Sequence, residues 1–118
     1  MVRFNTMRII ARRTLKRFVE SRAGHRGLAL KAALDAWFHE VRKARWAGTA
    51  AVKRFYRTAS VIWADRIVFN IKGNEYRLVV AVDFEKGIVW IKWIGTHAAY
   101  DEIDVKTVTY EKPKAPSK

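Results

Sequence analysis

The hydrophobic pattern of this 118-residue chain changes its period once, near Ser60. Before that residue, apolar side chains recur every three or four positions, as at Leu15, Phe18 and Val19, which is the spacing of one helix face. After it, β-branched and aromatic residues dominate in the manner of β-strands. A helical half followed by a strand half, within a length that suits one domain, predicts an α+β fold.

The first half of the chain predicts two packed helices. The second apolar stripe repeats the spacing of the first and consists of Leu30, Leu34, Trp37, Phe38 and Val41. The intervening residues 21–27 include two glycines and no apolar anchor, so we expect a flexible connection there. Together these features predict a helical hairpin.

A short third helix is predicted to begin at residues 48–49, where Thr49 can act as the N-cap. Helical spacing directs Val52, Phe55 and Tyr56 toward the core. The outward face is then entirely cationic and consists of Lys53, Arg54 and Arg57.

Three runs after Ser60 predict strands, at residues 66–72, 75–84 and 88–94. Gly73-Asn74 suits a two-residue hairpin turn, because both residues tolerate positive φ. Residues 85–87 form the next reversal, and residues 7–10 are expected to add a strand before the first helix. The result is a mainly antiparallel sheet with the helices packed on one face.

The charge of the chain is strongly positive and unevenly distributed. There are 24 Lys and Arg residues against 11 Asp and Glu residues, which gives a net charge of +13. Residues 1–58 contribute 15 basic and 3 acidic residues of these totals, so the helical half provides nearly all of the positive field. Such a balance points to a polyanion, with nucleic acid the first partner to consider and a membrane surface the second.

Several classes of chemistry are excluded by composition. The chain has no cysteine, so disulfides, thiolate nucleophiles and cysteine-ligated zinc or iron–sulfur sites are ruled out. Its three histidines are scattered, and we expect neither a metal site nor another cofactor. Apolar runs are far shorter than the ~20 residues of a membrane-spanning helix, and a signal-peptide pattern is missing. We expect a cytoplasmic protein.

The predicted first hairpin gathers polar side chains on one face of the sheet. A turn at residues 73–74 pairs Lys72 with Glu75 and Asn70 with Arg77, and the alternation of side chains places Asn70, Lys72 and Arg77 together. The opposite face is apolar and forms the core. It consists of Ile67, Phe69, Ile71, Tyr76, Leu78, Val80 and Val82.

Lys92 decides the register of the second hairpin. Burial of an unpaired ammonium costs on the order of several kcal/mol, so we expect Val89, Ile91 and Trp93 in the core. Lys92 then lies beside Arg77 on the polar face. Trp90 shares that face, where its ring can stack on a base.

Gly95 is expected to end the third strand and to lead into a turn or a single helical loop. His97 and Tyr100 are three residues apart, so in helical geometry they share a side. They would overhang the polar face and complete a concavity containing an imidazole, a phenol and three cations. RNA cleavage by the internal 2′-hydroxyl needs such groups to transfer protons and to stabilise the phosphorane, and it needs no metal.

Four segments of the chain resemble the HigB toxin family. They are RIVFNIKGNEYRLVV at 66–80, IGTHAAYD at 94–101, MRII at 7–10 and AWFHEV at 36–41. The resemblance therefore covers residues 7–105, between an extension at residues 1–6 and a basic tail at 106–118 that is expected to be disordered.

The resemblance implies a RelE/ParE-like α+β domain, with a helical hairpin and a short third helix on one face of the sheet. It implies an mRNA interferase that cuts messages on the translating ribosome. It also implies a HigA-type helix-turn-helix antitoxin, through which alone the toxin would reach operator DNA. By position, Lys72, Arg77 and Lys92 match the basic sheet residues of the family, and His97 and Tyr100 match the end of its signature.

The candidate site follows from these two lines of reasoning. The predicted catalytic residues are His97, Arg77, Lys72 and Tyr100, and the predicted RNA-binding residues are Lys92, Asn70, Trp90, Lys53, Arg54 and Arg57. Glu75 stands where relatives often carry a cation, which lowers the local positive potential.

Other roles for these residues remain open. His97 can stabilise a turn, Arg77 can pair with Glu75 or Asp101, and the ring of Tyr100 can simply pack. The basic helices can contact ribosomal RNA or only keep the protein soluble. Two histidines outside the candidate site, at positions 25 and 39, are expected to be solvent-exposed. The alternative functions are a ParE-like gyrase-poisoning toxin and a basic nucleic-acid-binding module.

Overall fold

A computed structural model of the chain describes residues 7–22, 24–63, 65–105 and 108. The extension predicted at residues 1–6 lies outside this part, as does the tail predicted at 106–118 apart from Val108. The elements follow the order β1 (Arg8–Ile10), α1 (Arg12–Glu20), α2 (Gly24–Lys43), α3 (Thr49–Phe55), β2 (Ser60–Trp63), β3 (Arg66–Ile71), β4 (Tyr76–Asp83), β5 (Ile88–Thr96) and α4 (His97–Tyr100). This order confirms the predicted α+β class and the strand before the first helix.

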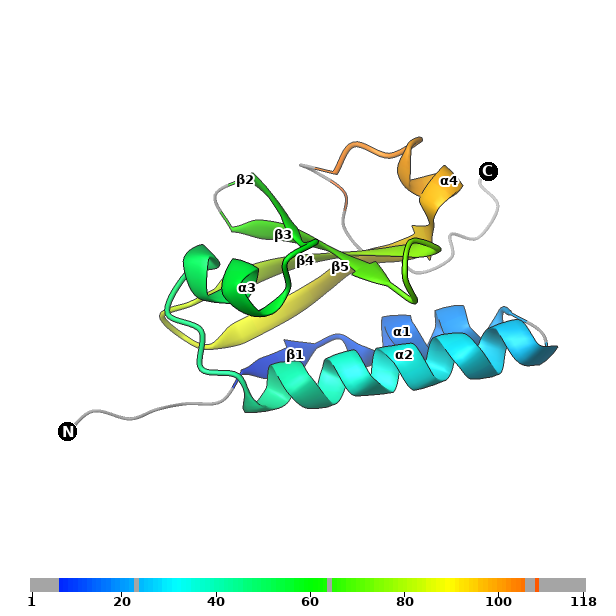
Figure 1. Ribbon diagram of the computed structural model, residues 1–118, viewed down its shortest axis with the longest axis horizontal. Coiled ribbons are helices and arrows are strands. Elements are labelled where there is room, and N and C mark those ends of the chain that lie inside the picture. Colours follow the sequence, from blue (N-terminus) through cyan, green and yellow to red (C-terminus); the bar gives the residue numbers. More distant parts are fainter. Residues whose placement is uncertain (1–6, 23, 64, 106–107, 109–118) are drawn as a thin grey trace, which may run out of the picture.

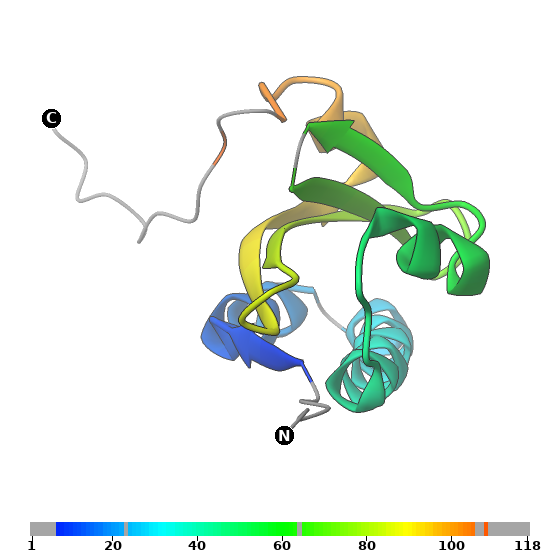
Figure 2. The ribbon, with the colours of Figure 1, turned by 90° about the vertical axis from the view of Figure 1, so that its left-hand side faces the viewer.

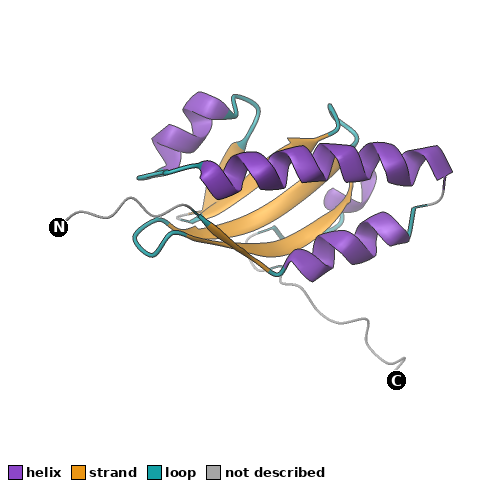
Figure 3. Cartoon of the chain, turned by 90° about the horizontal axis from the view of Figure 1, so that it is seen from below, coloured by secondary structure: helices purple, strands orange, loops and turns teal. Residues whose placement is uncertain are grey.

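The sheet separates two unequal layers. Its strand order is β1-β5-β4-β3-β2, and all pairs are antiparallel except β1 with β5. Helices α1 and α2 lie side by side on one face, whereas α4 and residues 101–105 lie on the other, which we call the outer face (Figure 1). The same order of layers is visible when the molecule is turned (Figure 2), and the view from the helical side shows α1 and α2 crossing the strands (Figure 3).

The core lies between the sheet and the long helix. All seven apolar positions predicted on the core face of β3 and β4 are buried, and they meet the buried stripe of α2. Trp37 and Phe69 pack edge to face with ring centroids 5.4 Å apart. Each fully buried side chain of this size contributes roughly 1.5–3 kcal/mol, so this contact fixes α2 against the strands.

The first hairpin has the predicted register but a wider turn. Asn70 pairs with Arg77 and Ile71 with Tyr76, as the alternation predicted. The strands stop there, so residues 72–75 form the turn in place of the predicted two-residue connection. Lys72 adopts φ 55° and Gly73 φ 65°, and this left-handed pair produces the tight reversal.

A β-bulge at Lys92 corrects the predicted register of the second hairpin. Val80 pairs with Ile91, but Val79 pairs with Trp93, so β5 has one extra residue between these pairs. Val89 and Ile91 face the core as predicted; Trp93 was predicted there wrongly and faces outward, while Ile94 is buried in its place. The bulge keeps apolar residues inward on both of its sides without burying the ammonium.

The bulge also overturns the predicted contact between two cations. Arg77 faces Gly95 across the strands, and Lys92 lies three residues before that position. Gly95 does not end the strand, because β5 continues to Thr96. A Cβ at Gly95 would overlap the Trp93 ring, so the glycine makes room for that indole on the outer face.

Smaller corrections concern the helices and one edge strand. Helix α2 begins at Gly24, so the connection is shorter than the predicted 21–27. The N-cap of α3 is Gly48 and not Thr49, and Phe55 is 61% exposed although it was predicted to face inward. Strand β2, which pairs with the edge of β3, was not predicted.

In the described part of the chain, no helix is long and apolar enough to cross a bilayer.

Candidate active site

An open groove lies at the end of the molecule where the α1–α2 connection, the β3–β4 turn and the start of α4 meet. Its volume is about 670 Å³. The residues that line it are Arg22, His25, Arg26, Ala29, Lys72, Glu75, Tyr76, Thr96, His97 and Ala98. Helix and strand segments therefore contribute opposite walls, which we call the helical wall (Arg22, His25, Arg26) and the strand wall (Lys72, Glu75, His97).

Local hydrogen bonds position His97 in the strand wall. The hydroxyl of Thr96 accepts a hydrogen bond from the Ala99 amide at 3.1 Å, which caps the short helix α4 directly after β5. The backbone amide of His97 donates to the Glu75 carbonyl at 2.9 Å. The start of α4 is thus tied to the β3–β4 turn, and the exposed imidazole of His97 lines the groove.

Lys72 forms an ion pair within the strand wall. Its ammonium lies 3.1 Å from the Glu75 carboxylate, and the two side chains are 35% and 58% exposed. An ion pair as exposed as this contributes roughly 0–1 kcal/mol, because water solvates both charges well. A phosphate oxygen entering the groove can therefore compete with Glu75 for the Lys72 ammonium.

Aromatic rings hold Arg22 in the helical wall. The guanidinium carbon lies 5.6 Å from the ring centroid of Phe18 and 5.7 Å from that of Tyr76. These rings pack edge to face at 5.7 Å, so Arg22 is half-buried against a fixed aromatic pair. Cation–π contacts of this kind orient a guanidinium without neutralising it.

The charges of the groove favour an anion. Arg22, Arg26 and Lys72 oppose the single carboxylate of Glu75, and two imidazoles stand in the same space. Sequence reasoning singled out neither arginine and treated His25 only as solvent-exposed. The positive charge of the first half was the only signal for these residues, and it did not say which of them would meet the strands.

Arg77 and Asn70 lie elsewhere, opposite each other on the outer face. One nitrogen of Arg77 donates to the Asn74 side chain at 2.8 Å, and another donates to the Asn74 carbonyl at 3.1 Å. The guanidinium is thereby held over the turn by an amide, and not by the carboxylates of Glu75 or Asp101. Arg77 does not line the groove that contains His97.

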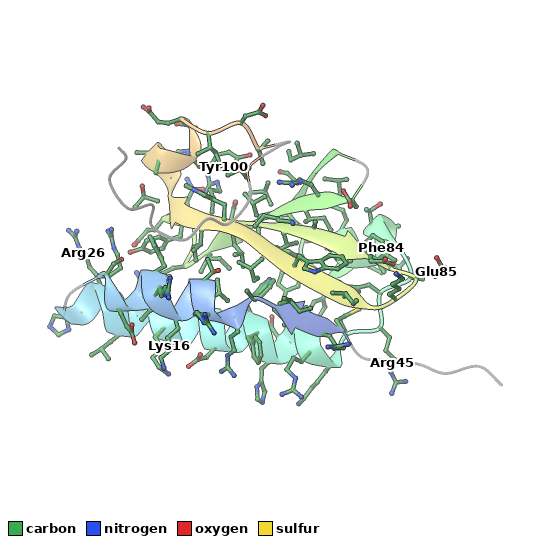
Figure 4. The ribbon with its side chains drawn as sticks, turned by 180° about the vertical axis from the view of Figure 1, so that it is seen from behind. Lys16, Arg26, Arg45, Phe84, Glu85 and Tyr100 are labelled. Carbon is green, nitrogen blue, oxygen red and sulfur yellow. The ribbon has the colours of Figure 1, made fainter. Side chains whose placement is uncertain are left out.

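Tyr100 and the predicted stacking residue also belong to the outer face. The Tyr100 ring lies 6.2 Å from the Trp93 ring, and both side chains are half-buried. Trp90 is half-buried opposite Ala81. In Figure 4, Arg26 extends from the helical layer and Tyr100 lies on the other side of the sheet. The groove brings together only Lys72 and His97 of the five residues expected in one concavity.

The predicted RNA-binding residues in α3 and directly after it have different surroundings. The Lys53 ammonium donates to the carbonyl oxygens of Arg57 at 3.1 Å and Ala59 at 2.6 Å, so it closes the end of the helix. Arg54 lines a separate groove beside Trp46. Arg57 is exposed.

Among the residues that the structure describes, no group of three or more His, Cys, Asp and Glu side chains is arranged to hold a metal ion.

Comparison with known families identifies the class to which this fold and groove belong. The matching family model covers residues 30–103, from α2 to just beyond α4, and describes RelE-like toxic components of toxin–antitoxin systems. The protein is therefore a RelE-like toxin, and such a toxin has an antitoxin partner. More specifically, the chain belongs to the HigB toxin family. No curated protein matches the chain.

Proposed function

We propose that this toxin is an endoribonuclease that cuts messenger RNA on the ribosome by attack of the 2′-hydroxyl, without a metal ion. The observation that supports it is the groove in which His97 and Lys72 face further cations from the helical hairpin. The proposed partners are the translated message, ribosomal RNA and a HigA-type antitoxin, in the cytoplasm.

The reaction assigns simple roles to the strand wall. The 2′-oxygen attacks the adjacent phosphorus and loses its proton, while the bond from phosphorus to the 5′-oxygen breaks and that oxygen gains a proton. His97 is one of the proton-transferring groups, and Lys72 leaves Glu75 to stabilise the charge on the phosphorane. The products carry a 2′,3′-cyclic phosphate and a 5′-hydroxyl.

The outer-face residues have a supporting role in this scheme. Arg77, Lys92 and Asn70 carry polar groups along the sheet, and the half-buried Trp90 and Tyr100 offer ring surface. We assign them to contacts with nucleotides beyond the reacting bond, because they lie outside the groove. Base stacking and phosphate contacts of this type bind RNA with little sequence preference.

The shape of the groove supports the proposed dependence on the ribosome. It is an open depression and offers no enclosed pocket for a base, so the protein must receive its message already positioned. Exposed basic residues of α1, together with Arg54 and Arg57, can dock on ribosomal phosphates for this purpose.

Mapping of message 5′ ends after induction of the toxin, with translation active or blocked, tests this proposal. The expected result is cuts confined to translated frames, absent with His97→Ala and present with His39→Ala, a control on the exposed surface of α2. Intact messages with DNA damage would favour a gyrase poison, and RNA binding without cuts would favour a binding module.

A further inference from the structure

The helical wall faces the strand wall across the groove, and no pattern in the sequence predicted this arrangement. We propose that the helical wall is the second half of the catalytic machinery: Arg22 binds the scissile phosphate, and His25 exchanges a proton with the substrate opposite His97. This inference rests on the proposed endoribonuclease function and adds residues to it.

Arg22 has the features of a phosphate ligand. Its guanidinium carbon lies 5.6 Å from the Phe18 ring centroid and 5.7 Å from that of Tyr76, so these rings orient it before substrate arrives. Within the described residues, no carboxylate lies within salt-bridge distance of Arg22; the nearest candidate in the groove, Glu75, is paired with Lys72. A planar guanidinium can donate two parallel hydrogen bonds to phosphate oxygens, which an ammonium cannot do.

His25 has the position of a proton-transfer group. It is the second residue of α2, is exposed, and lines the same groove as His97 from the opposite wall. No hydrogen bond joins its imidazole to the other described residues, so the ring can rotate toward a substrate. Two imidazoles on opposite walls suit a reaction in which a proton leaves on one side of the phosphorus and enters on the other.

Gly27 holds the two residues of the helical wall close to the rest of the hairpin. A Cβ at this position would overlap the Arg22 carbonyl, so only glycine allows the first turn of α2 to approach the end of α1 this closely. Arg22 and His25 are therefore positioned by the packing of the hairpin and not by a loose loop.

These groups account for both proton transfers in the cleavage step. One imidazole, neutral at the start, takes the proton of the 2′-hydroxyl as the new bond between the 2′-oxygen and phosphorus forms. The other, protonated at the start, gives its proton to the 5′-oxygen as the bond from phosphorus to that oxygen breaks. Arg22 and Lys72 stabilise the charge on the phosphorane and exchange no proton.

The test uses ribosomes programmed with a short synthetic message whose scissile bond is either a normal phosphodiester or a 5′-phosphorothiolate. A thiolate leaves without being protonated, so the sulfur linkage restores the rate of a variant that lacks the general acid but not of one that lacks the base. The variants are His25→Ala, His97→Ala and Arg22→Lys. The controls are His39→Ala and Arg42→Ala; Arg42 also lies over an aromatic ring, 5.9 Å from Phe38, but outside the groove.

The expected result is a loss of about 10²-fold or more for each histidine variant on the normal message, with one of the two restored by the sulfur linkage. Arg22→Lys should lose about tenfold, because it keeps the charge but not the paired donors. Both controls should cut normally.

Two results would overturn the inference. Normal cutting by His25→Ala, with cutting lost in His97→Ala, would remove the helical wall from catalysis and leave the proposed function intact. Loss in both variants without rescue of either by sulfur would refute the exchange of protons by this pair. By contrast, absence of cutting by the unaltered protein would refute the proposed function itself.

Discussion

The two ends of the molecule both carry basic residues, but the contacts of these residues differ. At the α3 end, Lys53 is bonded to two carbonyl oxygens, and the hydroxyl of Tyr56 donates to the Glu40 carboxylate. At the groove end, and among the described residues, Lys72 is held only by an exposed ion pair and Arg22 only by aromatic faces. The difference teaches that a cation is available to a ligand where the fold orients it but does not occupy its hydrogen-bond donors with strong acceptors.

The largest effect should follow from removal of His97. His97→Ala takes a proton-transfer group out of the groove, and such groups contribute about 10²–10⁴-fold to a rate. We expect cleavage on programmed ribosomes to fall by about 10³-fold, with an unchanged midpoint of thermal unfolding because the side chain is exposed. A reduction of less than about threefold would remove His97 from the mechanism.

A pair of lysine substitutions compares the two ends directly. Lys72→Ala should lower cleavage by about 10²-fold, since it removes the charge that we propose stabilises the transition state, and should leave the free energy of unfolding within about 1 kcal/mol. Lys53→Ala should do the reverse, with unaltered cleavage and a loss of about 1 kcal/mol of stability. Cleavage time courses and urea titrations check both variants, and equal behaviour of the two would contradict the comparison.

A smaller effect is expected for the exposed arginines after Lys53. In the double variant Arg54→Glu, Arg57→Glu, co-sedimentation with ribosomes should weaken about tenfold, and its salt dependence should flatten by a slope of roughly one to two. The positions of the cuts should not change, because these residues are remote from the groove. Unchanged sedimentation would assign the charge of α3 to solubility alone.

The smallest effect concerns pH at the α3 end. Burial, together with the hydrogen bond to Glu40 and its charge, raises the pKa of Tyr56 above its ordinary value of 10.0. The unfolded chain therefore loses this proton first, so the contribution of Tyr56 to stability is complete below pH 10 and declines as the pH rises further. The difference in the free energy of unfolding between the natural chain and Tyr56→Phe should shrink above pH 10. A constant difference would contradict the assigned environment.

The sequence predicted those parts of the fold that depend on local periodicity. The stripe of α2 and the alternation along β3 and β4 correctly identified the core face, because each position was decided by its neighbours in the chain. The bulge at Lys92 could not be predicted in this way: Ile91, Trp93 and Ile94 are all apolar, so either register of β5 offers a side chain that suits the core.

The site was predicted less completely for a similar reason. The predicted residues Lys72 and His97 both line the groove, because they directly follow β3 and β5, the two strands that flank the start of β4. The helical wall depends on how the hairpin of α1 and α2 docks against the β3–β4 turn, and this contact joins residues about fifty positions apart. Local patterns carry no information about such a contact.

The central claim is that the groove cuts RNA through its own 2′-hydroxyl, and one substitution in the substrate tests it. A synthetic message on ribosomes, with a single 2′-deoxynucleotide on the 5′ side of the mapped cut, should resist cleavage at that bond, whereas the all-ribose message should yield a 2′,3′-cyclic phosphate and a 5′-hydroxyl. Cutting of the deoxy-substituted bond at an undiminished rate would contradict the account.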